Sequence, residues 1–136
     1  MLGTMSRSIP VSTRSRSEFI DITATVDDFV KSSKVKSGLC HIFVPHTTAA
    51  VMINENADPS VRSDILRWLD RHVPANGDYA HSEGNADSHI KSMLVGPGKT
   101  VPVENGELKL GSWQGIYFCE FDGPRPRKVI VTVSER

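Results

Sequence analysis

The chain has 136 residues, of which 38% are hydrophobic and 24% charged, and its 16 basic residues balance its 16 acidic ones. This length suits one folded domain, and the composition excludes disordered, collagen-like and coiled-coil classes. Proteins that bind nucleic acid usually carry a basic excess, so zero net charge argues against DNA or RNA. No apolar run approaches the roughly 20 residues of a membrane span. From the length we expect one domain, residues 1–136. Two cysteines, Cys40 and Cys119, cannot build a disulfide framework, so we expect the protein in the reducing cytoplasm.

The first seventeen residues allow two interpretations. They contain three arginines, many hydroxyl side chains and no acid, which is the composition of a transit peptide. Residues 8–12 also fit a first β-strand, with a polar turn after it. We favour the strand, and a targeting role stays open.

The next segments predict a strand, a helix and a buried strand. Residues 19–22 form a short apolar strand, after which Thr25 offers a helix N-cap hydroxyl and Gly38 a stop signal. Residues 39–44 are almost continuously apolar, which indicates a strand that is buried on both faces. Pro45 cannot donate to a sheet, so this strand ends before it.

The middle of the chain predicts a second helix and a long loop. Residues 48–54 fit another strand, and residues 59–72 form a helix that begins at a proline and has one apolar side. Residues 73–87 are polar and rich in Gly, Asn and Asp, and long loops in compact domains are often functional. Residues 88–95 fit a short helical segment.

The last third of the chain predicts antiparallel strands. Residues 100–104 and 107–110 flank an Asn-Gly pair, which is a strong hairpin signal. Residues 113–121 and 128–133 supply two further strands. The expected fold class is therefore α+β, a mostly antiparallel sheet or sandwich with two main helices.

One apparent motif fails on inspection. Residues 96–100 read Gly-Pro-Gly-Lys-Thr, like the end of a phosphate-binding loop. Met93 stands where that loop needs a further glycine, and the residues that follow are strand-like instead of helical. The segment is better explained as a plain turn.

Three of the five histidines fall in loop-like positions. His41 lies within a strand and His72 at a helix end, and a structural role explains both. His46 follows the proline that ends a strand, while His81 and His89 flank a polar segment with carboxylates. Neutral imidazoles beside carboxylates suit a metal ion. Their spacing matches no standard zinc pattern, so the residues alone leave metal binding open.

Two other polar groups permit a functional or a structural explanation. Asp58 can cap the second helix, but Glu55 has no evident structural task and could act as a general base. Arg125 and Arg127, with the neighbouring lysine, form either a solvated turn or a phosphate contact. Trp113, next to Gln114, could stack on a planar ring or fill the core.

Several blocks of sequence together resemble the YjbQ-like family, whose members are named secondary thiamine-phosphate synthases. The matching blocks are residues 46–49, 54–62, 81–91, 111–116 and 121–125, in the family's order across nearly the whole chain. We find no broken motif among them.

This resemblance implies a compact α+β fold in a homotrimer, a divalent metal ion such as zinc or magnesium, and no nucleic-acid or membrane partner. It implies the joining of a pyrimidine diphosphate to a thiazole phosphate with loss of pyrophosphate, so the ligand is a small phosphorylated metabolite. The residues that we expect to take part are His46, His81 and His89 as metal ligands, Glu55 and Lys91 in catalysis, and Thr47, Thr48, Asn56, Trp113, Gln114, Arg125 and Arg127 in substrate binding.

Two rival functions remain. A metal with an open position can activate water as readily as it stabilises a leaving group, which describes a hydrolase of a phosphorylated metabolite. A trimeric binding or regulatory module without catalysis is the other. A fold or a family can host different main reactions, so sequence alone does not choose among them.

Overall fold

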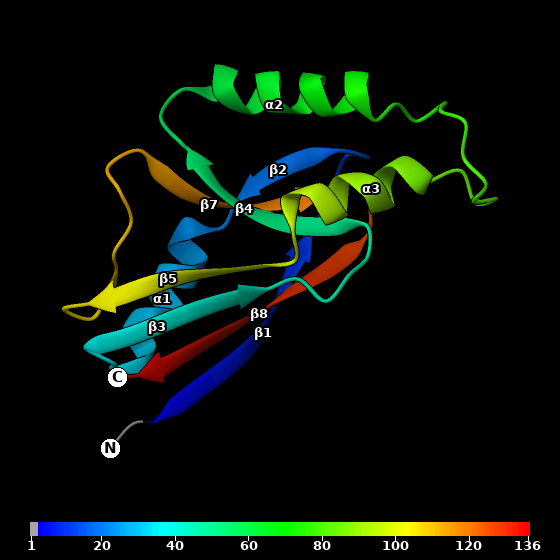
Figure 1. The fold of residues 1–136 in the computed structure, drawn as a ribbon. Helices are drawn as coiled ribbons and strands as arrows, with labels where there is room; N and C mark the ends of the chain where they lie inside the picture. Colours follow the sequence, from blue (N-terminus) through cyan, green and yellow to red (C-terminus); the bar gives the residue numbers. More distant parts are fainter. Residues whose placement is uncertain (1–2) are drawn as a thin grey trace.

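Two antiparallel sheets and three helices make up the computed structural model, which describes residues 3–136 (Figure 1). In chain order the elements are β1 (Thr4–Ser12), β2 (Glu18–Asp21), α1 (Thr23–Ser33), β3 (Ser37–Phe43), β4 (Ala49–Glu55), α2 (Pro59–His72), α3 (Ala86–Val95), β5 (Gly98–Glu104), β6 (Glu107–Leu108), β7 (Gln114–Glu120) and β8 (Pro126–Glu135). The larger sheet has the order β1-β8-β3-β5-β6, and the smaller has the order β2-β7-β4.

The main core lies between the two sheets. Strand β3 has one solvated face, so the prediction that residues 39–44 are buried on both faces is wrong. Its side chains alternate strictly, with Cys40 and Ile42 buried and Leu39 exposed. The inward side chains of β3, β5 and β8 pack with α1, where Val26 and Val30 are fully buried. One face of β4 and β7 closes this core from the other side.

The smaller sheet is buried on both faces. Its second face carries Met52, Tyr117 and Cys119, which pack with Leu69 of α2 and, less completely buried, Val95 of α3. Figure 1 shows α2 and α3 on the side of this sheet that faces away from the larger one. Burial on both faces explains why β7 is an almost unbroken apolar run.

The α+β class with mostly antiparallel strands is confirmed, and so are the N-terminal strand and the second helix. Strand β1 pairs with β8 from Thr4 to Ser12, which is longer than residues 8–12. Helix α2 covers the 59–72 range, with Asp58 accepting a hydrogen bond from the Ser60 backbone N–H. Helix α3 begins two residues earlier than the predicted 88–95 segment and forms a third regular helix.

The predicted ends of the first helix are wrong. The Asp21 carboxylate accepts hydrogen bonds from the Thr23 backbone N–H at 2.9 Å and from its hydroxyl at 2.6 Å, so the helix begins at Thr23. Thr25 lies inside it. The helix ends at Ser33, and its C-cap residue Lys34, four residues before Gly38, adopts the left-handed conformation with φ 62°.

The Asn-Gly hairpin is confirmed. Asn105 and Gly106 have φ values of 54° and 78°, as a turn with two left-handed residues requires. Strand β6 is shorter than the predicted 107–110 strand and ends at Leu108. Among residues 3–136, no helix has the length and apolar character to cross a membrane.

Candidate functional site

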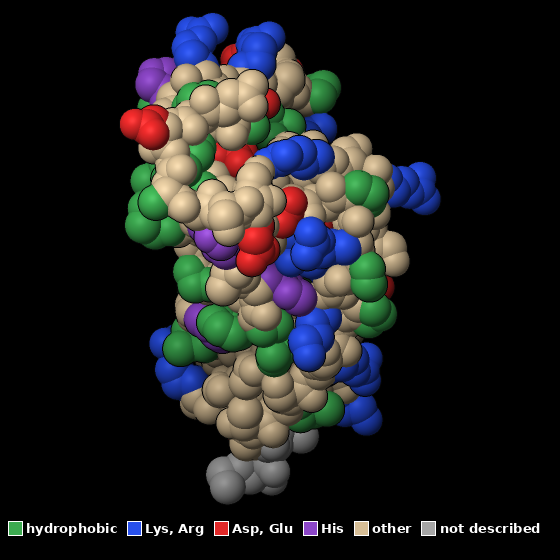
Figure 2. Space-filling view, turned by 90° about the vertical axis from the view of Figure 1, so that its right-hand side faces the viewer, with side chains coloured by type: hydrophobic (Ala, Val, Ile, Leu, Met, Phe, Trp, Pro, Cys, Tyr) green, Lys and Arg blue, Asp and Glu red, His purple; other side chains and the backbone are tan. Residues whose placement is uncertain are grey.

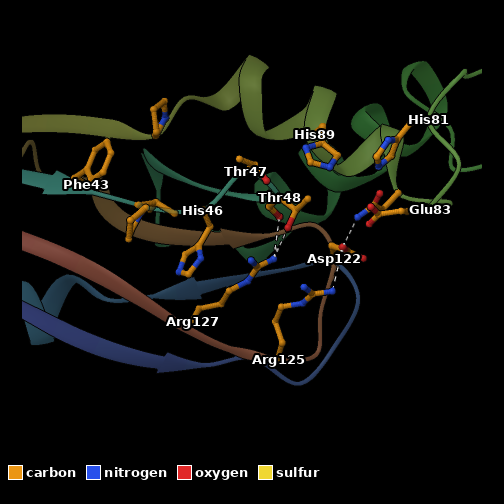
Figure 3. A pocket seen from close by; sticks show the side chains of 14 residues that line it. Phe43, His46, Thr47, Thr48, His81, Glu83, His89, Asp122, Arg125 and Arg127 are labelled. Carbon is orange, nitrogen blue, oxygen red and sulfur yellow. Dashed lines mark hydrogen bonds and ion pairs between the residues drawn. The ribbon is translucent and has the colours of Figure 1, made fainter.

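A large cavity opens where the ends of both sheets meet α3. It measures ≈ 730 Å³, within the usual range for small-molecule sites. Figure 2 shows histidine, acidic and basic side chains gathered on one face of the molecule, and Figure 3 shows the cavity's side chains. Its lining comprises Phe43, Val44, Pro45, His46, Thr47, Thr48, His81, Glu83, Asn85, His89, Pro97, Asp122, Arg125 and Arg127.

His46 enters the cavity because the chain must leave the sheet before Pro45. The backbone N–H of Val44 still donates to the Pro97 carbonyl at 2.8 Å, and the segment then crosses to β4. The Lys128 backbone N–H donates to His46 Nε2 at 3.1 Å, so the neutral ring carries its proton on Nδ1. Burial, followed by the nearby Arg127 charge, lowers the pKa of His46.

His81 and His89 form a pair on the opposite wall. His81 lies in the loop after α2 and His89 in the first half of α3, and their ring centroids are 5.3 Å apart in an edge-on arrangement. Figure 3 shows His46 apart from this pair, across the same cavity. Within residues 3–136, no three His, Cys, Asp or Glu side chains are grouped closely enough to hold a metal ion.

Arg127 forms the floor of the cavity within a buried polar network. Its side chain is 4% exposed, and its Nε donates to Glu120 at 2.8 Å. Its Nη2 donates to the hydroxyl and carbonyl oxygens of Thr48, and to Glu120 as well. Among the contacts of residues 3–136, its Nη1 has no protein hydrogen bond. The guanidinium is therefore held in place with one nitrogen still free to donate.

Asp122 connects the basic side of the cavity to α3. Its Oδ2 accepts from Arg125 Nη2 at 3.1 Å and from Asn85 Nδ2 at 2.7 Å. The Oδ1 atom of Asn85 is buried and has no hydrogen-bond partner among the described residues. A buried acceptor without a donor is costly, so this atom needs a water or a ligand.

Seven predicted site residues line this cavity. They come from three separate parts of the chain, which local patterns alone could not have placed together. They are His46, Thr47, Thr48, His81, His89, Arg125 and Arg127. Thr48 contributes through Arg127, because its hydroxyl accepts from the guanidinium.

Four other predicted residues lie at the far end of β4. Strand β4 begins beside the cavity and ends at Glu55, about 20 Å away for seven residues. The Glu55 carboxylate accepts from the Ala57 backbone N–H, and the Asn56 backbone N–H donates to the Trp113 carbonyl. Gln114 accepts from the Gly111 backbone N–H, so this group stabilises local turns and lines no part of the cavity.

Lys91 is also separated from the cavity. It lies two residues after His89, a rotation of roughly 200° around the helix, so its side chain leaves on the other face. Its ammonium group is 3% exposed and donates to Asp87 at 3.0 Å and Asp70 at 2.8 Å. Asp87 also accepts from Arg16, which gives Lys91 a structural role in joining α3, α2 and the segment before β2.

We expect Lys91→Met to lower the free energy of unfolding by about 2 kcal/mol. The substitution leaves the buried Asp87 carboxylate paired with Arg16 alone. Because one partner remains, the loss of stability should be smaller than when a buried carboxylate loses its only partner. Urea denaturation measures the change. Lys109→Met, in an exposed pair with Glu104, is the matched control and should cost less than about 0.5 kcal/mol. A folded Lys91→Met protein that had lost all catalysis would instead restore a catalytic role.

Sequence reasoning did not single out Glu83, Asn85 or Asp122, which all line the cavity. Glu83 and Asn85 belong to the long polar loop, and that loop was the available signal. Asp122 looked like a turn residue because it precedes Gly123. Its second function depends on α3 packing beside the turn, which a local pattern does not encode.

Comparison with known proteins identifies the class of this chain. The family described as UPF0047 protein YjbQ-like matches residues 7–136, so the chain belongs to that family. It is 50% identical over 123 residues to a UPF0047 protein of Methanocaldococcus jannaschii, covering 90% of this chain and 89% of the relative. It is 50% identical over 124 residues to UPF0047 protein YugU of Bacillus subtilis, covering 90% and 94%.

Solved structures agree with this assignment. A YjbQ/UPF0047 protein of Clostridium acetobutylicum has a TM-score of 0.92 and 52% identity, covering 93% of this chain and 98% of that one. A protein of Sulfolobus solfataricus, described as of unknown function, has a TM-score of 0.94 and 34% identity, covering 98% of each chain.

The expected thiamine-phosphate synthase activity is wrong on these comparisons. The relatives are named only as UPF0047 or YjbQ-like proteins, and the Sulfolobus protein as one of unknown function. None of these names indicates that activity. The predicted metal ion, phosphorylated ligand, homotrimer and cytoplasmic location are untested by these matches and stay predictions.

Proposed function

We propose that this protein is a metal-dependent hydrolase of small phosphorylated metabolites, with the ≈ 730 Å³ cavity as its active site. The observation that carries the proposal is the arrangement of two opposed walls. The His81–His89 pair forms one wall, and Arg125 with Arg127 forms the other (Figure 3). Imidazoles suit a metal ion and guanidinium groups suit a phosphate.

The spacing of the histidine pair fits a shared metal ion. Imidazole nitrogens bind zinc at about 2.1 Å, and two such rings at a tetrahedral angle have centroids roughly 5 Å apart. The rings of His81 and His89 are 5.3 Å apart. His46, across the same cavity, would be the third ligand in this proposal, and its ring would have to turn away from the Lys128 backbone N–H to join the pair.

The basic wall fits a phosphate group. Arg127 is held by Glu120 and offers the free Nη1, and Arg125 is a half-exposed side chain that can exchange Asp122 for a ligand oxygen. The Thr47 hydroxyl lines the same cavity and can donate to a phosphate oxygen. Paired donors of this kind fix an anion's position as well as its charge.

The reaction is the addition of water to phosphorus and the breaking of the ester P–O bond. A divalent ion, held by the histidines, would supply a Lewis acid for the phosphoryl oxygen. Glu83, which lines the cavity, accepts the proton from the attacking water, and that proton then passes to the departing oxygen. Arg125 and Arg127 stabilise the charge that develops on the phosphoryl oxygens.

Phosphate release by metal-stripped and metal-reloaded protein tests this function. We expect turnover of at least one phosphomonoester in a panel, with a loss of at least about 100-fold after chelation. Arg125→Met should raise KM about tenfold, because a charged hydrogen bond to the substrate is lost. Arg71→Met, an exposed arginine on α2, is the control.

Two results would contradict the proposal in different ways. Tight binding of the phosphomonoesters without any turnover would identify a binding or regulatory module. One observation favours that alternative. Both arginines of the cavity already have carboxylate partners, so ligand binding must rearrange these ion pairs. Neither binding nor turnover with any metal would remove phosphate chemistry from this cavity.

A further inference from the structure

A second cavity shares the histidine pair with the first. It measures ≈ 450 Å³, and His81 and His89 belong to its lining as well as to that of the first cavity. The other lining residues come from the loop before His81 and from the first turns of α3. They are Asp78, Tyr79, Ala80, Ala86 and Ile90.

The two cavities differ in chemistry. The first combines arginines, carboxylates and hydroxyl groups with four apolar residues. Apart from Asp78 and the two shared histidines, the second is lined only by an aromatic ring, two alanine methyl groups and the Ile90 side chain. Asp78 is its one carboxylate. An apolar hollow that opens beside a polar site is typical of a place where the organic part of a ligand leaves water.

Local contacts hold the aromatic wall in place. The Tyr79 hydroxyl donates to the Pro74 carbonyl at 2.6 Å. The Tyr79 ring lies so close to Gly77 that a Cβ added there would stand 2.5 Å from Cζ. Gly77 therefore permits the ring to rest against the backbone. The loop from 74 to 80 presents a fixed apolar surface to the cavity.

We propose that the second cavity binds the apolar or aromatic group of the substrate, so that the substrates are phosphate esters of ring-bearing or apolar alcohols. This inference rests on the proposed function. Because His81 and His89 line both cavities, the group attached to a phosphate held between the arginines and this pair can extend over the imidazoles into the second cavity. The Asp78 carboxylate is available to accept a hydrogen bond from a substituent on that group.

Binding of two phosphonates to the metal-loaded protein tests the inference without turnover. Methylphosphonate and phenylphosphonate share the charged group and differ in the ring. Calorimetry should show phenylphosphonate binding about tenfold more tightly, because the ring is removed from water in the second cavity. Ala86→Leu should reduce this affinity ratio to below about threefold by filling the cavity.

A second variant and a control protect this test from folding artefacts. Ala80→Leu fills the same cavity from an exposed loop position, and circular dichroism checks that both variants fold. Met93→Ala changes an exposed apolar side chain on the same helix outside both cavities, and should keep the wild-type ratio.

The outcomes separate the two proposals. Equal affinity for the two phosphonates, or an unchanged ratio in Ala86→Leu and Ala80→Leu, overturns the apolar subsite and leaves the phosphate site standing. Failure of the wild-type protein to bind either phosphonate removes the proposed function together with the subsite. A ratio that collapses only in the two filled variants supports both.

Discussion

Glu120→Leu should lower the free energy of unfolding by about 3–5 kcal/mol, with a fall in Tm of roughly 10–15 °C. Glu120 is fully buried and accepts hydrogen bonds from Arg127, from the Thr13 hydroxyl and from two backbone N–H groups. Removing the carboxylate leaves the Arg127 guanidinium without its counter-charge in a desolvated position. Thermal and urea denaturation of the purified variant measure the effect.

The double variant Glu120→Leu with Arg127→Met is the matched control. Replacing a buried ion pair by apolar side chains often costs little, whereas removing one partner is expensive. The double variant should therefore regain at least about 2 kcal/mol over Glu120→Leu alone. A double variant no more stable than the single one would show that the loss comes from packing, and that the ion pair is not its cause.

The same carboxylate makes stability depend on pH. Burial alone would raise the pKa of Glu120, but hydrogen bonds from Arg127, the Asp122 backbone N–H and Thr13 lower it below the ordinary value of 4.5. The unfolded chain then binds a proton more readily than the folded one. Glu120 thus contributes its full stabilisation above about pH 4.5, and loses it as the pH falls through the lower folded pKa.

The sequence indicates that Glu120 needs an ion-pair partner, but it does not identify that partner. Residues 115–121 are apolar apart from this one glutamate, and a charge in a buried strand is almost always paired. The sequence does not say with which residue. Arg127 is its partner because the turn between β7 and β8 brings the two strand ends together. The sequence had suggested only a solvated turn or a phosphate contact for Arg127.

Local patterns located elements better than they located contacts. The Asn-Gly turn and the proline at the start of α2 fixed a hairpin and a helix, because each acts on its neighbours. Grouping His46 with His81 and His89 came from the family resemblance, since 35 residues separate the first two. A catalytic role for Glu55 required the fold to bring it near His46. The two residues flank opposite ends of β4, and the Glu55 carboxylate lies outside the cavity.

His89→Ala should weaken zinc binding by at least about 100-fold, beyond the usual 10–100-fold effect of residues that only orient a metal ligand. Two ligands of the proposed ion, His81 and His89, are already adjacent, with ring centroids 5.3 Å apart. Removing either imidazole leaves a single ligand of this pair and abolishes its chelation of the ion. His81→Ala should therefore match His89→Ala. His46→Ala should cost less, because its ring must first leave the Lys128 N–H. Calorimetric zinc titration of the stripped proteins measures all three.

His72→Ala provides the matched control for this series. His72 stacks on Trp68 at the exposed end of α2 and belongs to neither cavity, so its loss should leave zinc affinity within about twofold. Equal losses in all four variants would mean that zinc binds surface imidazoles without a defined site. Unchanged affinity in both His81→Ala and His89→Ala would remove the metal from the mechanism. The edge-on ring pair would then only pack the loop against α3, and hydrolysis would depend on the arginines and Glu83.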